Sequence, residues 1–212
     1  MFKPYSILTF LLFLSSLHAC PLDFDQTPSD FIINTKQIVI PNHPHAFNPS
    51  IVRWQGKLLL CFRELIPSKL PSQKRCFPLD THESRLSLVW LNEEFEPIST
   101  PSILELSYHP FSRLEDPRLV VVANQLYIVY SDNLNHIYSG QGCRVFVAGI
   151  ETCDDNFFVY NRECLSHFEG ECHEKAEKNW VPFDYHGNLL LSYSIAPHRV
   201  LFPLCGTNTC EA

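Results

Sequence analysis

The chain has 212 residues, of which 45% are hydrophobic and 18% are charged, and its formal net charge at pH 7 is −7. This length and composition predict one globular domain with a substantial core and leave too little chain for two full domains. The acidic balance, without any run of lysine or arginine, argues against nucleic acid or an anionic membrane surface as a partner.

The N-terminus predicts a secretory signal peptide over residues 1–19. A lysine precedes the apolar run YSILTFLLFLSSL, which is too short to span a bilayer, and Ala19 lies where cleavage is expected. Leu17, Ala19 and Cys20 also resemble a bacterial lipoprotein box, with a histidine as its poorly fitting position. We therefore expect a secreted or extracytoplasmic protein, periplasmic or lipid-anchored at Cys20 if bacterial, with its mature domain over 20–212.

Nine cysteines are many for this length, and in a secreted chain they predict disulfide bonds. Setting Cys20 aside leaves an even number, although the sequence does not fix the pairing. Plausible local pairs are Cys205 with Cys210, Cys143 with Cys153, and Cys164 with Cys172. No C-x-x-C motif occurs, which argues against a zinc ribbon or a thioredoxin-type site, and no metal site is predicted.

A sixteen-residue pattern occurs three times without a gap. The copies are NPSIVRWQGKLLLCFR from Asn48, DPRLVVVANQLYIVYS from Asp116 and NWVPFDYHGNLLLSYS from Asn179. Each copy begins with a short amide or acid, continues as a β-rich run and ends in an aliphatic and aromatic run. Their ninth positions hold the turn residues Gly56, Asn124 and Gly187. The recurrence predicts one strand–turn–strand unit used three times.

The spacing of the copies predicts the fold class. They start 68 and 63 residues apart, which leaves room for further strands, and residues 84–91 and 143–151 supply candidates. The 16 prolines and the lack of sustained i, i+3, i+4 apolar spacing argue against helices. We predict an all-β fold with about three antiparallel blades of a β-propeller. Because the inner strand of each blade lines a central channel, Asn48, Asp116 and Asn179 would converge on one pocket.

Several motifs in order then resemble one enzyme family. FNPSIVRWQGKLLLCFRE, RLEDPRLV, EKNWVPF and YSIAPHRVL, between about Ile38 and Leu201, are similar to glycoside hydrolase family 130. That family comprises five-bladed propellers that include β-mannoside phosphorylases and β-1,2-mannosidases, and related transferases acting on β-mannan share the motifs. The resemblance implies a five-bladed-type propeller that is incomplete in this chain. We expect a fragment, a dimer, or a reduced fold held by disulfides.

The resemblance also implies a role for each motif residue. Asp116 matches the catalytic acid, which protonates the leaving oxygen and in phosphorylases acts by way of a sugar hydroxyl. The residues assigned to sugar binding are Asn48, Arg63, Glu115 and Asn179. The residues at or near the cationic positions that hold the attacking phosphate are Arg118, Lys178 and His198.

The chemistry of these residue types agrees with the assignment. Inverting cleavage needs one carboxyl group as an acid and a nucleophile on the opposite face of the sugar. Phosphate is already anionic and needs cations to hold it rather than a base. One acid among several cations therefore favours phosphorolysis, with inorganic phosphate as a co-substrate and no other cofactor. Structural interpretations stay open, because Asp116 would also suit a strand-entry turn and Arg63 with Arg118 an ion-paired layer between blades.

Two classes of function follow from these observations. The first is a secreted enzyme that cleaves β-mannosidic bonds of an oligosaccharide or glycan with phosphate or water, or forms them as a β-mannosyltransferase. The second is a non-catalytic glycan-binding or degenerate propeller. An open arc would also expose a sheet face, which favours self-association. We expect one concavity to be surrounded by Asn48, Arg63, Asp116, Arg118 and Lys178.

Overall fold

The computed structural model describes residues 35–67, 82–107, 113–133, 142–153, 156–165, 167–168, 177–204, 206–207 and 209–211. The chain divides into two units, Met1–Gln37 and Ile38–Ala212, and the fold described below belongs to the second. The predicted signal peptide and Cys20 lie outside the described residues. Within the described ranges, no helix has the length and apolar character needed to cross a membrane.

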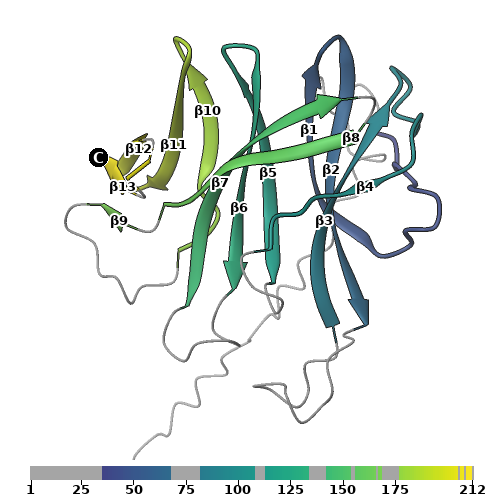
Figure 1. The fold of residues 1–212 in the computed structure, drawn as a ribbon, viewed down its shortest axis with the longest axis horizontal. Coiled ribbons are helices and arrows are strands. Elements are labelled where there is room, and N and C mark those ends of the chain that lie inside the picture. The colour runs from purple at the N-terminus through teal and green to yellow at the C-terminus, as the bar shows by residue number, and fades with distance from the viewer. Residues whose placement is uncertain are drawn as a thin grey trace, which may run out of the picture. The chain divides into compact units, whose positions relative to one another are not determined.

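All regular elements of the described part are β-strands, and they form three sheets (Figure 1). The first sheet has the order β1 (Ala46–Trp54), β2 (Lys57–Pro67), β3 (His82–Leu91) and β4 (Ser102–Ile103). The second has the order β5 (Leu114–Val122), β6 (Gln125–Asn133), β7 (Cys143–Cys153) and β8 (Asn156–Cys164). The third has the order β10 (Val181–Tyr185), β11 (Asn188–Ile195), β12 (His198–Leu204), β13 (Thr209–Glu211) and β9 (His167–Phe168). Neighbouring strands are antiparallel except for β13 and β9, which are parallel.

Each sheet begins with the hairpin that the repeat predicts, and the turns share one geometry. Both central residues have positive φ in all three turns: Gln55 (50°) and Gly56 (75°), Ala123 (48°) and Asn124 (66°), His186 (51°) and Gly187 (80°). Two-residue turns with positive φ at both positions are of type I′, whose twist matches that of the flanking strands. Glycine adopts this region without steric cost, which explains why two of the three turns contain it.

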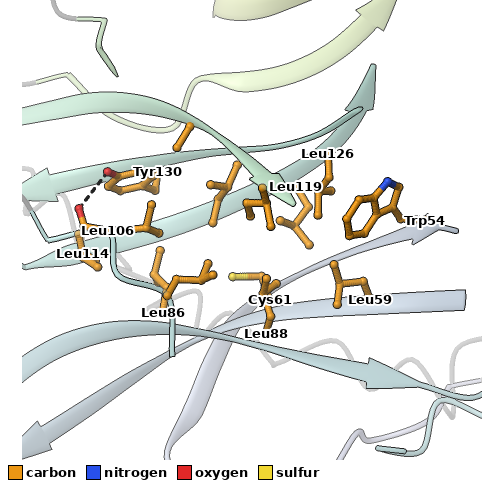
Figure 2. Close-up of a cluster of buried hydrophobic side chains, with 14 of the residues drawn as sticks. Trp54, Leu59, Cys61, Leu86, Leu88, Leu106, Leu114, Leu119, Leu126 and Tyr130 are labelled. Carbon is orange, nitrogen blue, oxygen red and sulfur yellow. Dashed lines mark hydrogen bonds between the residues drawn. The ribbon is translucent and has the colours of Figure 1, made fainter. Parts of the chain in front are cut away.

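A first hydrophobic core fills the space between the first and second sheets (Figure 2). Side chains alternate between the two faces of a strand, so Leu59 and Cys61 of β2 point toward the second sheet together. The opposing wall includes Leu119 and Tyr130, and the Tyr130 hydroxyl donates to the carbonyl of Leu106 at 3.2 Å, the dashed line in Figure 2. The core thus makes the two sheets one packed structure.

Two further cores cover the remaining faces. Between the second and third sheets, Val129 and Val145 pack with Trp180, Leu191 and Leu201. The other face of the first sheet is covered by the segment that precedes β1, in a cluster made of Ile40, Leu58, Leu60, Phe62, Val89 and Leu91. The first strands are neighbours as well, since β5 contacts both β1 and β10. The fold is therefore part of a β-propeller, which confirms the predicted all-β class and the three antiparallel units.

The cysteines depart from the sequence prediction, because no disulfide joins residues of the described part. The buried free thiols are Cys61, Cys143 and Cys210. The pair Cys143 and Cys153 was wrong: these residues end the same strand, β7, roughly 33 Å apart at about 3.3 Å per residue, far beyond the reach of a disulfide. The other two suggested pairs involve Cys172 and Cys205, which lie outside the described residues. Burial raises the pKa of the Cys143 thiol to about 11 and that of Cys210 to about 12, so both stay protonated at neutral pH.

Candidate active site

The N-P and D-P dipeptides of the first two repeats lie at matching β-bulges. In each sheet the register shifts, so that Asn48–Pro49 and Asp116–Pro117 each face a single residue of the neighbouring strand. Proline suits such a position because it has no N–H to offer the ladder. A bulge bends its strand and changes the direction of a side chain. The two dipeptides therefore determine where the amide and the acid point.

The leading residue of each repeat has the same unusual backbone conformation. The φ angles of Asn48, Asp116 and Asn179 are 48°, 49° and 64°, in the left-handed region. Asparagine and aspartate tolerate this region better than other residues with a side chain, although at some energetic cost. Strained backbone of this kind is concentrated at functional sites. At Asn48 and Asp116 the bulge requires this backbone, which favours a short amide or acid, and Asn179 adopts the same conformation in the segment before β10.

The bulges bring the predicted acid and the predicted sugar-binding amide into contact. The Nδ2 of Asn48 donates to the Oδ1 of Asp116 at 2.5 Å, across 68 residues of sequence and between two sheets. Asn48 is exposed and Asp116 is half-buried, so the pair is accessible from solvent. A carboxyl group held by one oxygen at an accessible position can exchange a proton with a ligand.

Arg63 and Glu115 form a second contact between the sheets. The Nη2 of Arg63 donates to the Oε1 of Glu115 at 3.2 Å, and the side chains are only 14% and 17% exposed. The Nε of Arg63 donates to the Oγ of Ser84 at 2.7 Å, and the guanidinium lies 5.1 Å from the centre of the Phe47 ring. The Ser84 hydroxyl in turn donates to the carbonyl of Leu114 at 2.5 Å. Arg63 is thus held rigidly directly beside the strand that carries Asp116.

The other predicted site residues have different surroundings. Arg118 is half-buried and donates from Nη1 to the carbonyl of its neighbour Pro117 at 3.1 Å. Lys178 and Asn179 are exposed in the segment before β10. His198 is exposed at the start of β12, with its Nε2 3.4 Å from the Oγ of Ser192. Within the described ranges, no hydrogen bond or ion pair joins any of these four residues to Asp116. The structure therefore pairs Asn48 with Asp116 and Arg63 with Glu115, and the phosphate-binding role of Arg118, Lys178 and His198 stays a prediction.

Sequence reasoning missed two serines whose hydroxyls connect the first sheet to the second. The Oγ of Ser50 accepts the backbone N–H of Leu119 at 2.8 Å, just beyond the two bulges. Ser84, which is only 5% exposed, makes the second contact by donating to the carbonyl of Leu114, as described above. The one available signal was a serine within an apolar strand, which predicts a hydrogen bond but not its partner.

A cluster around Glu64 lies on the opposite face of β2. The Oε1 of Glu64 lies 3.1 Å from the Nδ1 of His43, a residue to which the sequence assigned no role, and the Oε2 accepts from Arg85 Nε and Nη2 at 3.0 and 2.7 Å. Burial raises the pKa of the Glu64 carboxyl, but the hydrogen bonds and charges of Arg85 and His43 outweigh burial and bring the pKa below its ordinary value. Because these contacts attach the segment before β1 to the first sheet, we assign the cluster a structural role. Among the described residues, no group of three His, Cys, Asp or Glu side chains is arranged to hold a metal ion.

Comparisons with known proteins agree on the fold. No family model matches the chain, and no curated protein matches it. A family 117 glycoside hydrolase from the marine bacterium Zobellia galactanivorans superposes with a TM-score of 0.53 and 15% sequence identity, covering 74% of this chain and 52% of that structure. This chain therefore spans about half the length of that enzyme. At this identity the likeness is one of fold.

Two weaker matches are also carbohydrate-active proteins. Trypanosoma rangeli sialidase in complex with the inhibitor DANA has a TM-score of 0.44 and 15% identity, over 78% of this chain and 30% of its own. A mannose phosphorylase from Leishmania mexicana in complex with a phosphate ion has a TM-score of 0.43 and 12% identity, over 84% of this chain and 50% of its own. Scores of this size carry no argument about activity, and the resemblance to family 130 stays a prediction.

Proposed function

We propose that this chain is a carbohydrate-active protein that cleaves β-mannosidic bonds by an inverting mechanism, with Asp116 as the acid. The observation that carries the proposal is the contact between Asn48 and Asp116. Two residues 68 positions apart, both in left-handed backbone at matching bulges, meet at an accessible position of neighbouring inner strands. Strained backbone at both partners of this contact supports a function for the pair.

The geometry supports an acid role in particular. The contact with Asn48 uses the Oδ1 of Asp116, and the described residues offer no hydrogen bond to Oδ2. That oxygen can therefore deliver a proton to a leaving oxygen or to a sugar hydroxyl, as an inverting mechanism requires of one carboxyl group. The amide oxygen of Asn48 can accept a hydrogen bond from a sugar hydroxyl at the same place. Arg63 is positioned to bind the next part of the sugar, although Glu115 already balances its charge.

The nucleophile in this proposal is phosphate or water. Arg118, Lys178 and His198 form no ion pair with a carboxylate of the described part, so these side chains are available to an anion. Phosphate bound by these residues could attack from the face of the sugar opposite Asp116 without a base. Water would instead need a carboxylate base, and Glu115 is engaged by Arg63. These charges favour phosphate. A β-mannosyltransferase would use the same acid and sugar contacts in the direction of synthesis.

Turnover of β-mannooligosaccharides with and without inorganic phosphate tests the proposal. We expect release of mannose 1-phosphate only with phosphate, and loss of this product in Asp116→Asn. The matched control is Asp184→Asn, an exposed acid of the third sheet whose Oδ1 accepts the N–H of Gly187 and which should leave turnover unchanged. Phosphate-independent release of mannose would identify a hydrolase. Binding of the oligosaccharides without turnover would support the alternative, a non-catalytic glycan-binding protein, and the absence of both would overturn the proposal.

The proposal includes export from the cytoplasm. Residues 1–19 support it through their charged start, apolar run and small residue at the expected cleavage site. N-terminal sequencing of the mature protein from its natural source would test this part. A first residue at Cys20, with or without a lipid, agrees with export, whereas an intact Met1 contradicts it.

A further inference from the structure

The space between the second and third sheets is only partly filled. One part contains the core around Trp180, Leu191 and Leu201. Another part is a cleft with a volume of about 530 Å³, between side chains of β6, β7 and β8 on one side and residues of β11, β12 and the turn before β11 on the other. This volume is within the range of pockets that bind small molecules, about 300–1,000 Å³. In a propeller, adjacent blades usually exclude such a space by packing against each other, so its presence calls for a physical reason.

The reason lies in a glycine and a tyrosine that face each other on the second sheet. Gly149 of β7 pairs with Tyr160 of β8, and both line the cleft. A Cβ atom at position 149 would lie 2.2 Å from the Tyr160 ring, so only glycine allows the ring to lie against the backbone. Directly after Tyr160 the ladder between β7 and β8 shifts register, and Asn161 has a φ of 46°. The strand is therefore bent so that a flat aromatic ring and a strained asparagine stand side by side at the cleft.

The chemistry of the lining selects the type of ligand. Of the described residues that line the cleft, none is Lys, Arg or His, and the single charge is that of Glu163, whose two oxygens accept the N–H of Gly206 at 2.9 and 3.0 Å. An anionic ligand such as a phosphate or a nucleotide would find no counter-charge there. Three aromatic side chains remain, together with neutral hydrogen-bonding groups. The aromatic members are Tyr127, Tyr160 and Phe202, and the neutral polar members include Asn161, Asn188 and Thr207.

We propose that this cleft binds a neutral pyranose ring of a glycan, stacked on the face of Tyr160. A pyranose has one face of C–H groups, which suits an aromatic ring, and a rim of hydroxyls, which suits side-chain amides that both donate and accept. Asn161 and Asn188 line the two sides of the cleft. The Nδ2 of Asn188 already donates to the carbonyls of Tyr185 and His186 at 3.3 and 3.4 Å, so Asn188 offers its Oδ1 as an acceptor, whereas Asn161 can donate and accept. Asn161 follows Tyr160 directly in β8, so both residues reach the lining of the same cleft.

This site is separate from the candidate active site. Asp116 lies near the start of β5, whereas the cleft is reached at Val122, the last residue of that strand, roughly 20 Å away at about 3.3 Å per residue. The cleft also includes Gly187 and Asn188 at the β10–β11 turn, at the far end of the hairpin from Asn179. The site would hold another part of a glycan than the bond near Asp116. The inference stands whether or not the proposed function is correct.

Ligand-observed saturation-transfer NMR on the full chain tests the inference, with the methyl glycosides of glucose and N-acetylglucosamine as probes, because a mannoside would also bind at the proposed active site. We expect at least one probe to bind to wild type, and Tyr160→Ala to weaken that binding about tenfold, the order of effect for loss of a stacked ring. Tyr160→Phe keeps the stacking face and should stay within about threefold of wild type. Tyr185→Ala is the matched control, because Tyr185 is a 57% exposed tyrosine outside the cleft, and it should bind like wild type.

One further variant tests the role of the glycine. Gly149→Ala should weaken the binding of the probe by displacing the Tyr160 ring. Gly149→Ala is interpreted only if its far-UV circular dichroism matches that of wild type; Tyr160→Ala, which only removes atoms, carries the test in any case. Binding that Tyr160→Ala leaves intact, equal losses in Tyr160→Ala and Tyr185→Ala, or no binding of any probe would each overturn the inference.

Discussion

Replacing Ser84 by alanine should destabilise the fold, because its hydroxyl connects the first sheet to the second beside the candidate active site. The side chain is 5% exposed and lies on β3. Its oxygen accepts from Arg63 Nε at 2.7 Å and donates to the carbonyl of Leu114 at 2.5 Å. Leu114 begins the strand that carries Glu115 and Asp116, so the hydroxyl positions both the arginine and the acid's strand.

The magnitude follows from the two partners that alanine would leave without this contact. A net hydrogen bond between neutral groups is worth about 0.5–1.5 kcal/mol, and one to a charged group about 1.5–3 kcal/mol. Leu114 is 1% exposed, so water cannot readily replace the donor to its carbonyl, whereas Arg63 is 14% exposed and recovers part of its loss. We therefore expect Ser84→Ala to lower the free energy of unfolding by about 2–4 kcal/mol.

The same strand offers a matched control. Ser87 is fully buried, three residues further along β3, and its Oγ has no hydrogen-bond partner in the part of the chain that the structure describes. Removing an unpaired buried hydroxyl gives up no hydrogen bond, so Ser87→Ala should be neutral or stabilising. Urea unfolding followed by tryptophan fluorescence measures both variants. Equal losses for the two serines, or a loss below about 0.5 kcal/mol for Ser84→Ala, would refute the assigned hydrogen bonds.

The remaining predictions concern single contacts. The pKa of folded Glu64 lies below its ordinary value of 4.5. The ionised carboxylate therefore contributes fully to stability above about pH 4.5, and this contribution is lost as the pH falls through the folded-state pKa. Urea midpoints measured against pH should show this decline, and Glu64→Gln should make the midpoints less dependent on pH. Glu93→Gln should leave the urea midpoint unchanged, although Glu93 accepts from both Nη atoms of Arg53 at 2.6 and 2.8 Å, because the two side chains are 63% and 54% exposed; a clear loss that disappears at high salt would contradict this. Tyr130→Phe should lower the free energy of unfolding by about 0.5–1 kcal/mol in the same assay, since the carbonyl of Leu106 still accepts from Arg162 Nη1. A loss above about 2 kcal/mol would contradict this single-hydrogen-bond role of the hydroxyl.

Local features of the fold were predictable because their physics is local. A type I′ turn needs positive φ at two adjacent residues, and glycine or asparagine at positions 56, 124 and 187 indicates such a turn. Alternating apolar residues on either side of each turn then specify paired strands with one face buried. The N-P and D-P dipeptides likewise mark the bulges, since only a few residues accept the required backbone. Repetition of these signals was sufficient to predict three blades.

The hydrogen-bond and ion-pair partners of the polar side chains were harder to predict from the sequence. The sequence listed Arg63 and Glu115 separately as sugar ligands, but the structure pairs them with each other at 3.2 Å. No motif of the sequence marked His43, yet it contacts Glu64. In both cases the partner is 21 or more residues away in sequence, and its position depends on how sheets and segments pack. Nothing in the local pattern of a strand specifies which charge will oppose it from another sheet.

The sequence by itself determined the all-β class, the hairpin repeat and its turns, because turn geometry and side-chain alternation act over a few residues. Only the tertiary structure decided that Asn48 meets Asp116, that Cys143 and Cys153 stand at opposite ends of one strand, and that a cleft separates part of the second and third sheets. These outcomes depend on the packing of apolar faces from distant parts of the chain. That packing fixes the distances between side chains to within an ångström, whereas the sequence pattern fixes only the face on which each side chain lies.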